Sequence, residues 1–379
     1  MLVVKFGGTS VGKPERMKKI ADLVLGMSGR KIVVLSALSG TTNTLVKMGD
    51  HLLADRAQAA QQEIIELENH YRQFVQELFH STAYLAIGQE IVSRYFSLFR
   101  LLAAGTFDDR SYRELLAQGE LLSTELFYHH LQERKVNARL LPALHFMSID
   151  ENQEPELEKI GERLTPLLET MKEVEILVTQ GYICRNHRNE IDNLKRGGSD
   201  YTASLIGAAI RAQEIQIWTD IDGMHNNDPR VVKKTVPIAE LTFDEASELA
   251  YVGAKILHPS TIVPAQKYSV PVRLKNTMDE KAPGTIISDK GSKGKFKAVA
   301  AKDGIIAINI KSSRMLLAYG FLRRVFEVFE KYKTPIDMIS TSEVAVSVTI
   351  DEQKNLEAIV NELKNFGTIE VDQNHSIIC

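Results

Sequence analysis

Short apolar runs alternate with longer amphipathic stretches over the first 290 residues of the chain. Residues 2–4, 31–36 and 175–179 are short segments with an apolar centre, and the second is apolar enough to be a parallel strand that is buried on both faces. A helix is predicted from Pro14 to about Met27, between the first two runs. This strand–helix–strand order predicts an α/β fold, a three-layer arrangement in which helices cover both faces of a mostly parallel sheet.

Residues 45–131 show helical spacing almost throughout, with a pause near residues 105–108. A helical insertion between strands suggests a lid or a substrate-binding lobe. Inside it, Gly119 stands beside Glu120 in a helical pattern, where Gly costs about 1 kcal/mol relative to Ala. The glycine suggests that another group approaches the backbone closely. Taken alone, Glu120 is more often a solvated surface acid.

The last part of the chain has a different pattern. Residues 291–297 are polar, basic and rich in Gly, and predict a linker between a domain at 1–290 and one at 298–379. Beyond the linker, the order of apolar runs and amphipathic stretches is β-α-β-β-α-β, the ferredoxin-like arrangement. Such a module favours small-molecule sensing or dimerisation over chemistry of its own.

Composition removes several classes of function. A net charge of −3 over 379 residues argues against nucleic acid or an anionic membrane as a partner. No apolar run approaches the length of a membrane span. Cys184 and Cys379 are far apart and outside any metal-ligand spacing, so a reducing cytoplasm is the expected location.

The clearest candidate chemistry lies at the end of the first run, where Lys5 precedes the pair Gly7 and Gly8. A glycine turn at a helix entrance collects backbone N–H groups and binds anions readily. The stretch also matches G-x-x-x-x-G-K, but Pro14 stands where a P-loop needs a hydroxyl for magnesium. On this stretch alone, a phosphate cradle and a turn without a ligand are about equally supported.

A second glycine pair strengthens the first hypothesis. Gly197 and Gly198 follow the cations Lys195 and Arg196 and precede a helical pattern, with Ser199 as the expected N-cap. Several loops rich in Gly, cations and small hydroxyls therefore follow strands, which favours phosphoryl transfer, where positioning and charge neutralisation dominate. A carboxylate acceptor would need no general base, because it is already ionised at neutral pH. No protein metal site is predicted, since aspartates in turns such as 219–228 are usually structural.

Four motifs occur in register: KFGGTSVG from Lys5, KRGGSDYTA from Lys195, WTDIDG with a following DPR from Trp218, and GAKILHP from Gly253. Together they resemble the aspartokinases of the amino-acid-kinase superfamily, and the C-terminal module resembles the ACT domain of that family. The resemblance implies the amino-acid-kinase fold and transfer of the ATP γ-phosphoryl group, with Mg²⁺, to the side-chain carboxylate of L-aspartate. The product would be 4-phospho-L-aspartate, on the way to lysine, threonine and methionine.

The resemblance also implies roles for individual residues. Lys5 and Asp200 would act at the transferring phosphoryl group. Aspartate would be held by Ser36, Thr42, Glu120, Arg196 and Ser199. Nucleotide contacts would come from Lys5, Gly7, Gly8, Thr219, Asp220, His225, Arg230 and Lys255. Two positions depart from the family: Lys195 replaces a common Gly, and His225 replaces a common Tyr.

The ACT region implies feedback by lysine or threonine and a homodimer formed through this region. Its effector residues would be Met315, Gly320, Asp337, Thr341, Ser342 and Glu343. The family usually carries two interleaved ACT modules, and residues 297–301 and 376–379 look like the beginnings of a second, so we expect this region to be incomplete. Two alternatives stay open: a kinase of the same fold that acts on glutamate or another amino acid, and a non-catalytic amino-acid-binding regulatory protein.

Overall fold

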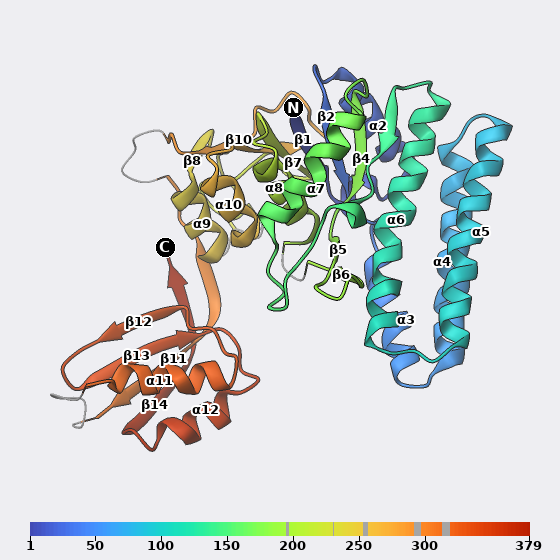
Figure 1. Ribbon diagram of the computed structural model, residues 1–379. Helices are drawn as coiled ribbons and strands as arrows, with labels where there is room; N and C mark the ends of the chain where they lie inside the picture. The colour runs from blue at the N-terminus through green and yellow to red at the C-terminus, as the bar shows by residue number, and fades with distance from the viewer. Residues whose placement is uncertain (195–196, 230, 253–256, 292–296, 313–318) are drawn as a thin grey trace. The chain divides into compact units, whose positions relative to one another are not determined.

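The computed structural model describes residues 1–194, 197–229, 231–252, 257–291, 297–312 and 319–379 of the chain (Figure 1). These residues form two compact units, Met1–Lys297 and Ala298–Cys379. Each unit has its own sheet and is described separately.

The first unit is built on an eight-stranded sheet in the order β3-β4-β2-β1-β7-β9-β10-β8. Every neighbouring pair is parallel except β9 and β10. The strands are β1 (Leu2–Phe6), β2 (Lys31–Leu35), β3 (Ala138–Leu140), β4 (Ile176–Gln180), β7 (Glu214–Thr219), β8 (Glu240–Thr242), β9 (Val272–Asn276) and β10 (Thr285–Ser288). The mostly parallel sheet that the apolar runs predict is confirmed.

The two faces of this sheet are covered by different helices. On one face, Val4 and Phe6 of β1 pack into a core with α2 (Pro14–Gly26), α3 (Thr41–Leu53) and α6 (Asp109–Glu133). Successive side chains of a strand point to opposite faces, so Val3 and Lys5 lie on the other one. There α8 (Gly198–Ala209) packs against β1, β2 and β7.

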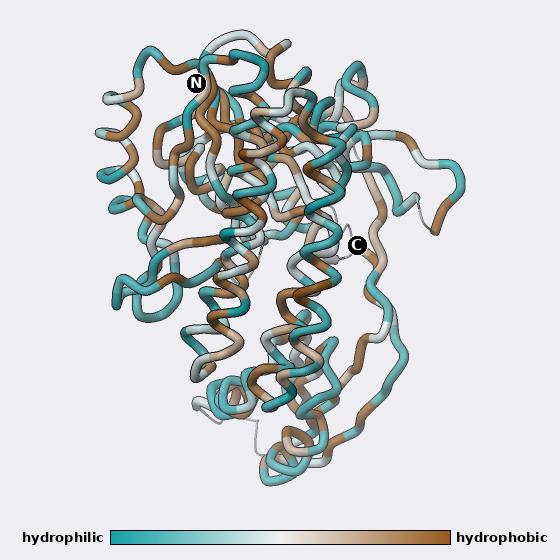
Figure 2. Tube along the Cα trace, turned by 90° about the vertical axis from the view of Figure 1, so that its right-hand side faces the viewer, coloured by the Kyte–Doolittle hydropathy of each residue, from teal (hydrophilic) through white to brown (hydrophobic). Residues whose placement is uncertain are grey.

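The predicted helical insertion consists of four helices: α4 (Ala57–Leu78) and α5 (Thr82–Ala104) follow α3 and precede α6 along the chain. Figure 1 shows α4 and α5 side by side next to α6. The predicted pause corresponds to the break between Ala104 and Asp109. Figure 2 shows these helices alternating between hydrophilic and hydrophobic residues along their length, as amphipathic helices do. Their apolar sides share one core with β1, β2 and β4, so the insertion is joined firmly to the sheet. No helix in the described ranges is long and apolar enough to cross a membrane.

Two local predictions differ from the structure. The helix after the second glycine pair begins at Gly198, earlier than an N-cap at Ser199 would place it. Gly197, with φ of 71°, is its N-cap in place of Ser199, because a left-handed residue turns the chain into the helix there. A hairpin of β5 (Ile183–Arg185) and β6 (Ile191–Asn193) was not anticipated, since each strand is only three residues long.

The remaining elements of the first unit are α1 (Gly8–Val11), the short 3-10 helix η1 (Ala143–His145), α7 (Leu157–Thr170), α9 (Phe243–Val252) and α10 (Pro259–Lys267).

The second unit is a four-stranded antiparallel sheet in the order β12-β13-β11-β14, with two helices. Its elements are β11 (Ala301–Lys311), α11 (Phe321–Lys331), β12 (Met338–Thr341), β13 (Ala345–Ile350), α12 (Leu356–Leu363) and β14 (Thr368–Ile378). This is the predicted β-α-β-β-α-β order. Residues 300 and 379 pair with each other at the end of the β11–β14 ribbon, and a second module remains a prediction.

Candidate active site

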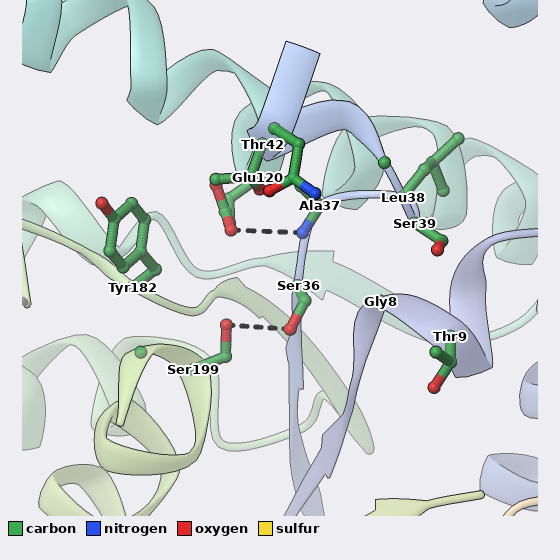
Figure 3. A pocket seen from close by; sticks show the side chains of 13 residues that line it. Gly8, Thr9, Ser36, Ala37, Leu38, Ser39, Thr42, Glu120, Tyr182 and Ser199 are labelled. Atoms are coloured by element: carbon green, nitrogen blue, oxygen red, sulfur yellow. Dashed lines mark hydrogen bonds between the residues drawn. The ribbon is translucent and has the colours of Figure 1, made fainter. Parts of the chain in front are cut away.

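A cavity of about 470 Å³ lies at the carboxyl ends of β1 and β2 and the start of α8 (Figure 3). Open parallel sheets bind ligands at this edge. The cavity is lined by Gly8, Thr9, Ser36, Ala37, Leu38, Ser39, Gly40, Thr42, Asn43, Glu120, Tyr182, Gly198 and Ser199. The structure thus brings Gly8 from the first glycine pair together with Gly198 from the second, although about 190 residues separate them.

Lys5 lies beside this cavity on β1 and is almost fully buried. Its Nζ is 2.6 Å from Oδ1 of Asp200, which lies in the first turn of α8. A Cβ atom on Gly7 would lie 3.1 Å from Nζ of Lys5, so glycine lets the amine lie against the backbone turn. The cation and the two glycine pairs therefore form one local cluster, while the chain as a whole carries a net negative charge.

Glu120 enters the cavity from α6 and is 4% exposed. Its Oε1 accepts a hydrogen bond from the Ala37 N–H at 3.3 Å, and its buried Oε2 has no partner among the residues that the structure describes (Figure 3). Burial raises the pKa of this carboxyl from 4.5 to about 8. The expectation that Glu120 is by default a surface acid is wrong, because its helix packs directly on the sheet.

Gly119 explains that close packing. A Cβ atom there would lie 3.0 Å from Cβ of Ala37 and 3.3 Å from side-chain atoms of Leu45 and Thr41. The group that the helical glycine admits is therefore the loop after β2, which also supplies the N–H that contacts Glu120.

Ser36 and Ser199 join the two sides of the cavity. The Ser36 hydroxyl donates to Oγ of Ser199 at 2.9 Å, which links the end of β2 to the first turn of α8 (Figure 3). The N-terminus of this 12-residue helix faces the same space, and its N–H groups and dipole favour an anion.

Tyr182 is a cavity residue whose position sequence reasoning missed. Its φ of 67° places a bulky residue in the left-handed region, a strain that clusters at functional sites. Its N–H donates to Oγ1 of Thr202 at 2.9 Å, and its carbonyl accepts from the Leu194 N–H at 2.7 Å. The run of Gln180, Gly181 and Tyr182 after a buried strand was the available signal.

Of the described residues expected at the nucleotide, Gly8 lines this cavity and Lys5 and Gly7 lie next to it, whereas Thr219, Asp220 and His225 are not among its lining residues. Thr219 ends β7, next to β1 in the sheet, and its Oγ1 accepts from the Ile221 N–H at 3.2 Å. His225 contacts Asp222 at 2.6 Å and Thr235 at 2.8 Å. Asp220 lies in the loop that follows β7, between Thr219 and Asp222. Arg196, Arg230 and Lys255 lie outside the described residues. Within the described ranges, no group of three or more His, Cys, Asp or Glu side chains is arranged to hold a metal ion.

The expected effector residues lie in three places in the second unit. Gly320 is the N-cap of α11 with φ of 76°. Asp337 accepts from Lys302 at 2.9 Å, and Lys302 also contacts Asp351 at 2.8 Å. Exposed residues at the end of β12 and in the following turn complete the set, namely Thr341, Ser342 and Glu343. Met315 lies outside the described residues.

Comparison with known proteins agrees with this architecture. The Amino acid kinase family model matches residues 1–276, and an ACT domain model matches residues 308–363. The chloroplastic aspartokinase 1 of Arabidopsis thaliana is 34% identical over 404 aligned residues, which cover 99% of this chain and 69% of that protein. The lysine-sensitive aspartokinase 3 of Escherichia coli is 32% identical over 393 residues, which cover all of this chain and 86% of that protein.

Solved structures give the same result. The Escherichia coli aspartokinase III complex with aspartate and ADP superimposes with a TM-score of 0.85 at 32% identity, covering 100% of this chain and 86% of the other. Its complex with lysine and aspartate gives a TM-score of 0.80. The parallel sheet, the cavity at the carboxyl ends of its strands and the antiparallel module thus define a small-molecule kinase with a regulatory domain. The chain belongs to the aspartokinases of the amino acid kinase family.

Proposed function

We propose that the chain transfers the γ-phosphoryl group of ATP to the side-chain carboxylate of L-aspartate, giving 4-phospho-L-aspartate. The observation that carries this proposal is the buried Oε2 of Glu120, which has no described partner in a cavity next to Lys5 and two glycine turns. A bound ammonium group would complete the hydrogen bonding of this carboxylate. The same chemistry suits the α-ammonium of an amino acid, and the aspartokinase III structure contains aspartate and ADP.

The remaining polar groups divide between the two ends of the substrate. Arg196 is proposed for the α-carboxylate, because a guanidinium forms bidentate pairs with carboxylates. Ser36, Thr42 and Ser199 supply hydroxyls around the cavity and would orient the side-chain carboxylate toward Lys5. That carboxylate is ionised at neutral pH and attacks without a general base.

The difficulty in this reaction is the approach of two anions. At about 4 Å, a pair of like charges costs on the order of 4 kcal/mol at an effective dielectric near 20. Lys5 would offset this repulsion at the transferring group, and Asp200 holds its ammonium in place through the 2.6 Å contact. Gly7, Gly8 and the N-terminus of α8 would add backbone N–H groups, while Thr219, Asp220, His225, Arg230 and Lys255 are proposed for the nucleotide.

Mg²⁺ completes the proposal. Protein sites for Mg²⁺ usually contribute one or two carboxylates while substrate phosphates and water supply the rest. The described residues, which hold isolated carboxylates such as Asp200 and Asp220 and no three-ligand cluster, fit an ion that arrives with the nucleotide. When bound, Mg²⁺ would neutralise charge on the β- and γ-phosphates.

Feedback is proposed through the second unit. The match to an ACT domain and the aspartokinase III complex with lysine favour lysine as the effector. Asp337 and Glu343 would bind its cationic groups, and Gly320, Thr341 and Ser342 would supply backbone and hydroxyl contacts; Met315 is proposed for the same site from the family resemblance alone. A homodimer formed through this unit and a cytoplasmic location, consistent with two free cysteines, belong to the same proposal.

A coupled assay of ADP release tests the reaction. The protein is incubated with ATP, Mg²⁺ and either L-aspartate, L-glutamate or no acceptor. We expect ADP formation that depends on L-aspartate and is lost in Lys5→Met, because that variant removes the cation but keeps the length of the side chain. ADP formation that ignores the acceptor, or that prefers glutamate, would reject aspartate as the substrate.

A further inference from the structure

Glu120 is held by a buried series of hydrogen bonds that begins at Ala143, the first residue of η1. The Ala143 N–H donates to Oε1 of Gln180 at 2.8 Å, and Nε2 of Gln180 donates to Oγ1 of Thr124 at 2.8 Å. The Thr124 hydroxyl in turn donates to the carbonyl oxygen of Glu120 at 2.8 Å. The chain thus runs from the segment after β3, through the last residue of β4, to the turn of α6 that carries the cavity carboxylate.

Burial shows that these contacts are built into the structure. Thr124 is fully buried and Gln180 is 4% exposed, so water does not readily replace either partner. A threonine that bonds the carbonyl four residues earlier is common in helices and proves nothing alone. Here, however, the same hydroxyl also accepts a hydrogen bond from a different element. Each buried polar group in the chain therefore depends on the next one.

A second tether fixes the same turn against β2. The Ser123 hydroxyl donates to the carbonyl of Ser36 at 2.8 Å, one residue before the Ala37 N–H that contacts the Glu120 carboxylate. The turn 120–124 is thus attached to the carboxyl ends of both β2 and β4. Those ends border the cavity, so the position of the Glu120 side chain relative to Lys5 and Ser199 is set by these contacts.

We propose that Thr124 and Gln180 are positioning residues that hold Glu120 in place to receive the ammonium group of the amino-acid substrate. This inference rests on the proposed function, because it concerns the same cavity. It assigns neither residue a contact with substrate. Small displacements of a binding group are costly, since a shift of about 1 Å in an active site can change rates by about a hundredfold.

The test is steady-state kinetics of Thr124→Val in the full chain. Valine keeps the shape of threonine but removes the hydroxyl, so both Gln180 and the Glu120 turn lose a partner. We expect KM for L-aspartate to rise about tenfold while KM for ATP stays within about twofold. A tenfold change in affinity corresponds to about 1.4 kcal/mol, which is within the free energy that one buried hydrogen bond contributes, if its loss lets Glu120 move. Thr124→Ser keeps the hydroxyl and should restore most of the aspartate affinity.

The chain offers a closely matched control in Thr179→Val. Thr179 is also fully buried, precedes Gln180 on β4, and its hydroxyl has no hydrogen-bond partner among the described residues. The same substitution there should leave both KM values unchanged. A rise in KM for aspartate equal to that of Thr124→Val would mean that any buried hydroxyl of this region matters, which contradicts the proposal.

A second variant separates positioning from simple loss of stability. Gln180→Met removes the other half of the contact, and the double variant Thr124→Val/Gln180→Met should have nearly the KM of the worse single variant, because both act through one path. Additive effects, or a lower unfolding temperature with an unchanged KM for aspartate, would overturn the inference. Wild-type activity on aspartate is measured first, so failure of the proposed reaction is seen independently of these variants. If Thr124→Val does not fold, Gln180→Met and Thr124→Ser carry the same comparison.

Discussion

At the scale of single residues, the carboxylate of Glu120 is the group in the cavity best suited to bind the ammonium group of an amino acid. It is buried, half hydrogen-bonded and raised in pKa to about 8 without a ligand. A group in this state destabilises the ligand-free protein when it ionises and binds a cation strongly. Ionisation of Glu120 therefore favours binding of an ammonium group but lowers the stability of the ligand-free protein.

Glu120→Gln tests that opposition. Between its ordinary pKa of 4.5 and about 8, the folded protein keeps a proton that the unfolded chain has lost, so this group lowers the free energy of unfolding as pH rises through that window. Gln cannot ionise, so calorimetry without substrate should show the variant gaining stability over wild type at about pH 8.5 but not at about pH 4.5. Affinity for aspartate should fall about a hundredfold, because a charged hydrogen bond is lost.

Glu133→Gln is the control with the opposite sign. Although partial burial opposes it, hydrogen bonds from the N–H groups of His80 and Ser81 hold the pKa of Glu133 below its ordinary value. Its contribution to stability is present above the ordinary pKa and is lost as pH falls through the lowered one. The variant should thus be less stable than wild type at neutral pH. A Glu120→Gln protein that loses stability in the same way would contradict the account of its burial.

The sequence predicted these residues unevenly. The glycine pairs, Lys5 and the acid beside Gly119 could be found because glycine in a strand end or a helix interior is a local signal. The burial of Glu120 and its link to Gln180 and Thr124 could not, because they arise only when β4, α6 and the loop after β2 come together. The local pattern predicts Ser199 as a helix N-cap. It cannot show that the Ser199 hydroxyl accepts a hydrogen bond from Ser36, because Ser36 lies on another element.

At the scale of elements, α6 is the helix of the insertion that reaches the cavity. One of its faces packs in the core with β1, β2 and β4, while Glu120 projects into the cavity. The close approach depends on Gly119, where a side chain would meet Ala37, Leu45 and Thr41. Helix periodicity predicted α6 well, and the approach distance needed the structure.

Gly119→Ala is expected to impair activity although alanine is the better helix former. The intrinsic gain of about 1 kcal/mol is opposed by contacts that would force α6 away from the loop after β2. We expect a fall of about tenfold in kcat/KM for aspartate, measured by steady-state kinetics.

Gly161→Ala in α7 is the matched control for that variant. A Cβ atom there would meet only the Ala209 carbonyl oxygen at 3.6 Å and the Ala209 Cβ at 3.9 Å, ordinary contact distances. The control should therefore be neutral or stabilising by up to about 1 kcal/mol in denaturant unfolding, with unchanged kinetics. Equal effects of the two substitutions would show that the packing at Gly119 does not position the site.

At the scale of the whole molecule, the chain separates into a catalytic and a regulatory unit with independent cores. The β-α-β-β-α-β order of the second unit was predictable from its apolar runs. The pairing of residues 300 and 379 was not, because the contact joins positions at opposite ends of that unit. Lys302 lies on the same ribbon and contacts Asp337, so a ligand that binds Asp337 would change the charge environment of β11 within this unit.

Asp337→Asn tests the proposed feedback. The substitution removes the charge that would bind an ammonium group of lysine while keeping the side-chain size. We expect the lysine concentration that halves activity to rise at least about tenfold, because a charged hydrogen bond contributes about 1.5–3 kcal/mol. Inhibition curves of wild type and variant, with threonine run in parallel, provide the measurement. Unchanged inhibition by lysine would place the effector elsewhere.

The identity of the phosphorylated product tests the central claim most directly. Phosphorus NMR can follow the protein with ATP, Mg²⁺ and L-aspartate, and hydroxylamine can then be added to trap an acyl phosphate. The account predicts an acyl-phosphate signal that grows with ADP, needs aspartate, disappears on trapping, is lost with Lys5→Met and is strongly reduced with Glu120→Gln at equal protein and subsaturating aspartate. ADP that appears with inorganic phosphate alone, or an acyl phosphate that forms equally well in both variants, would contradict it.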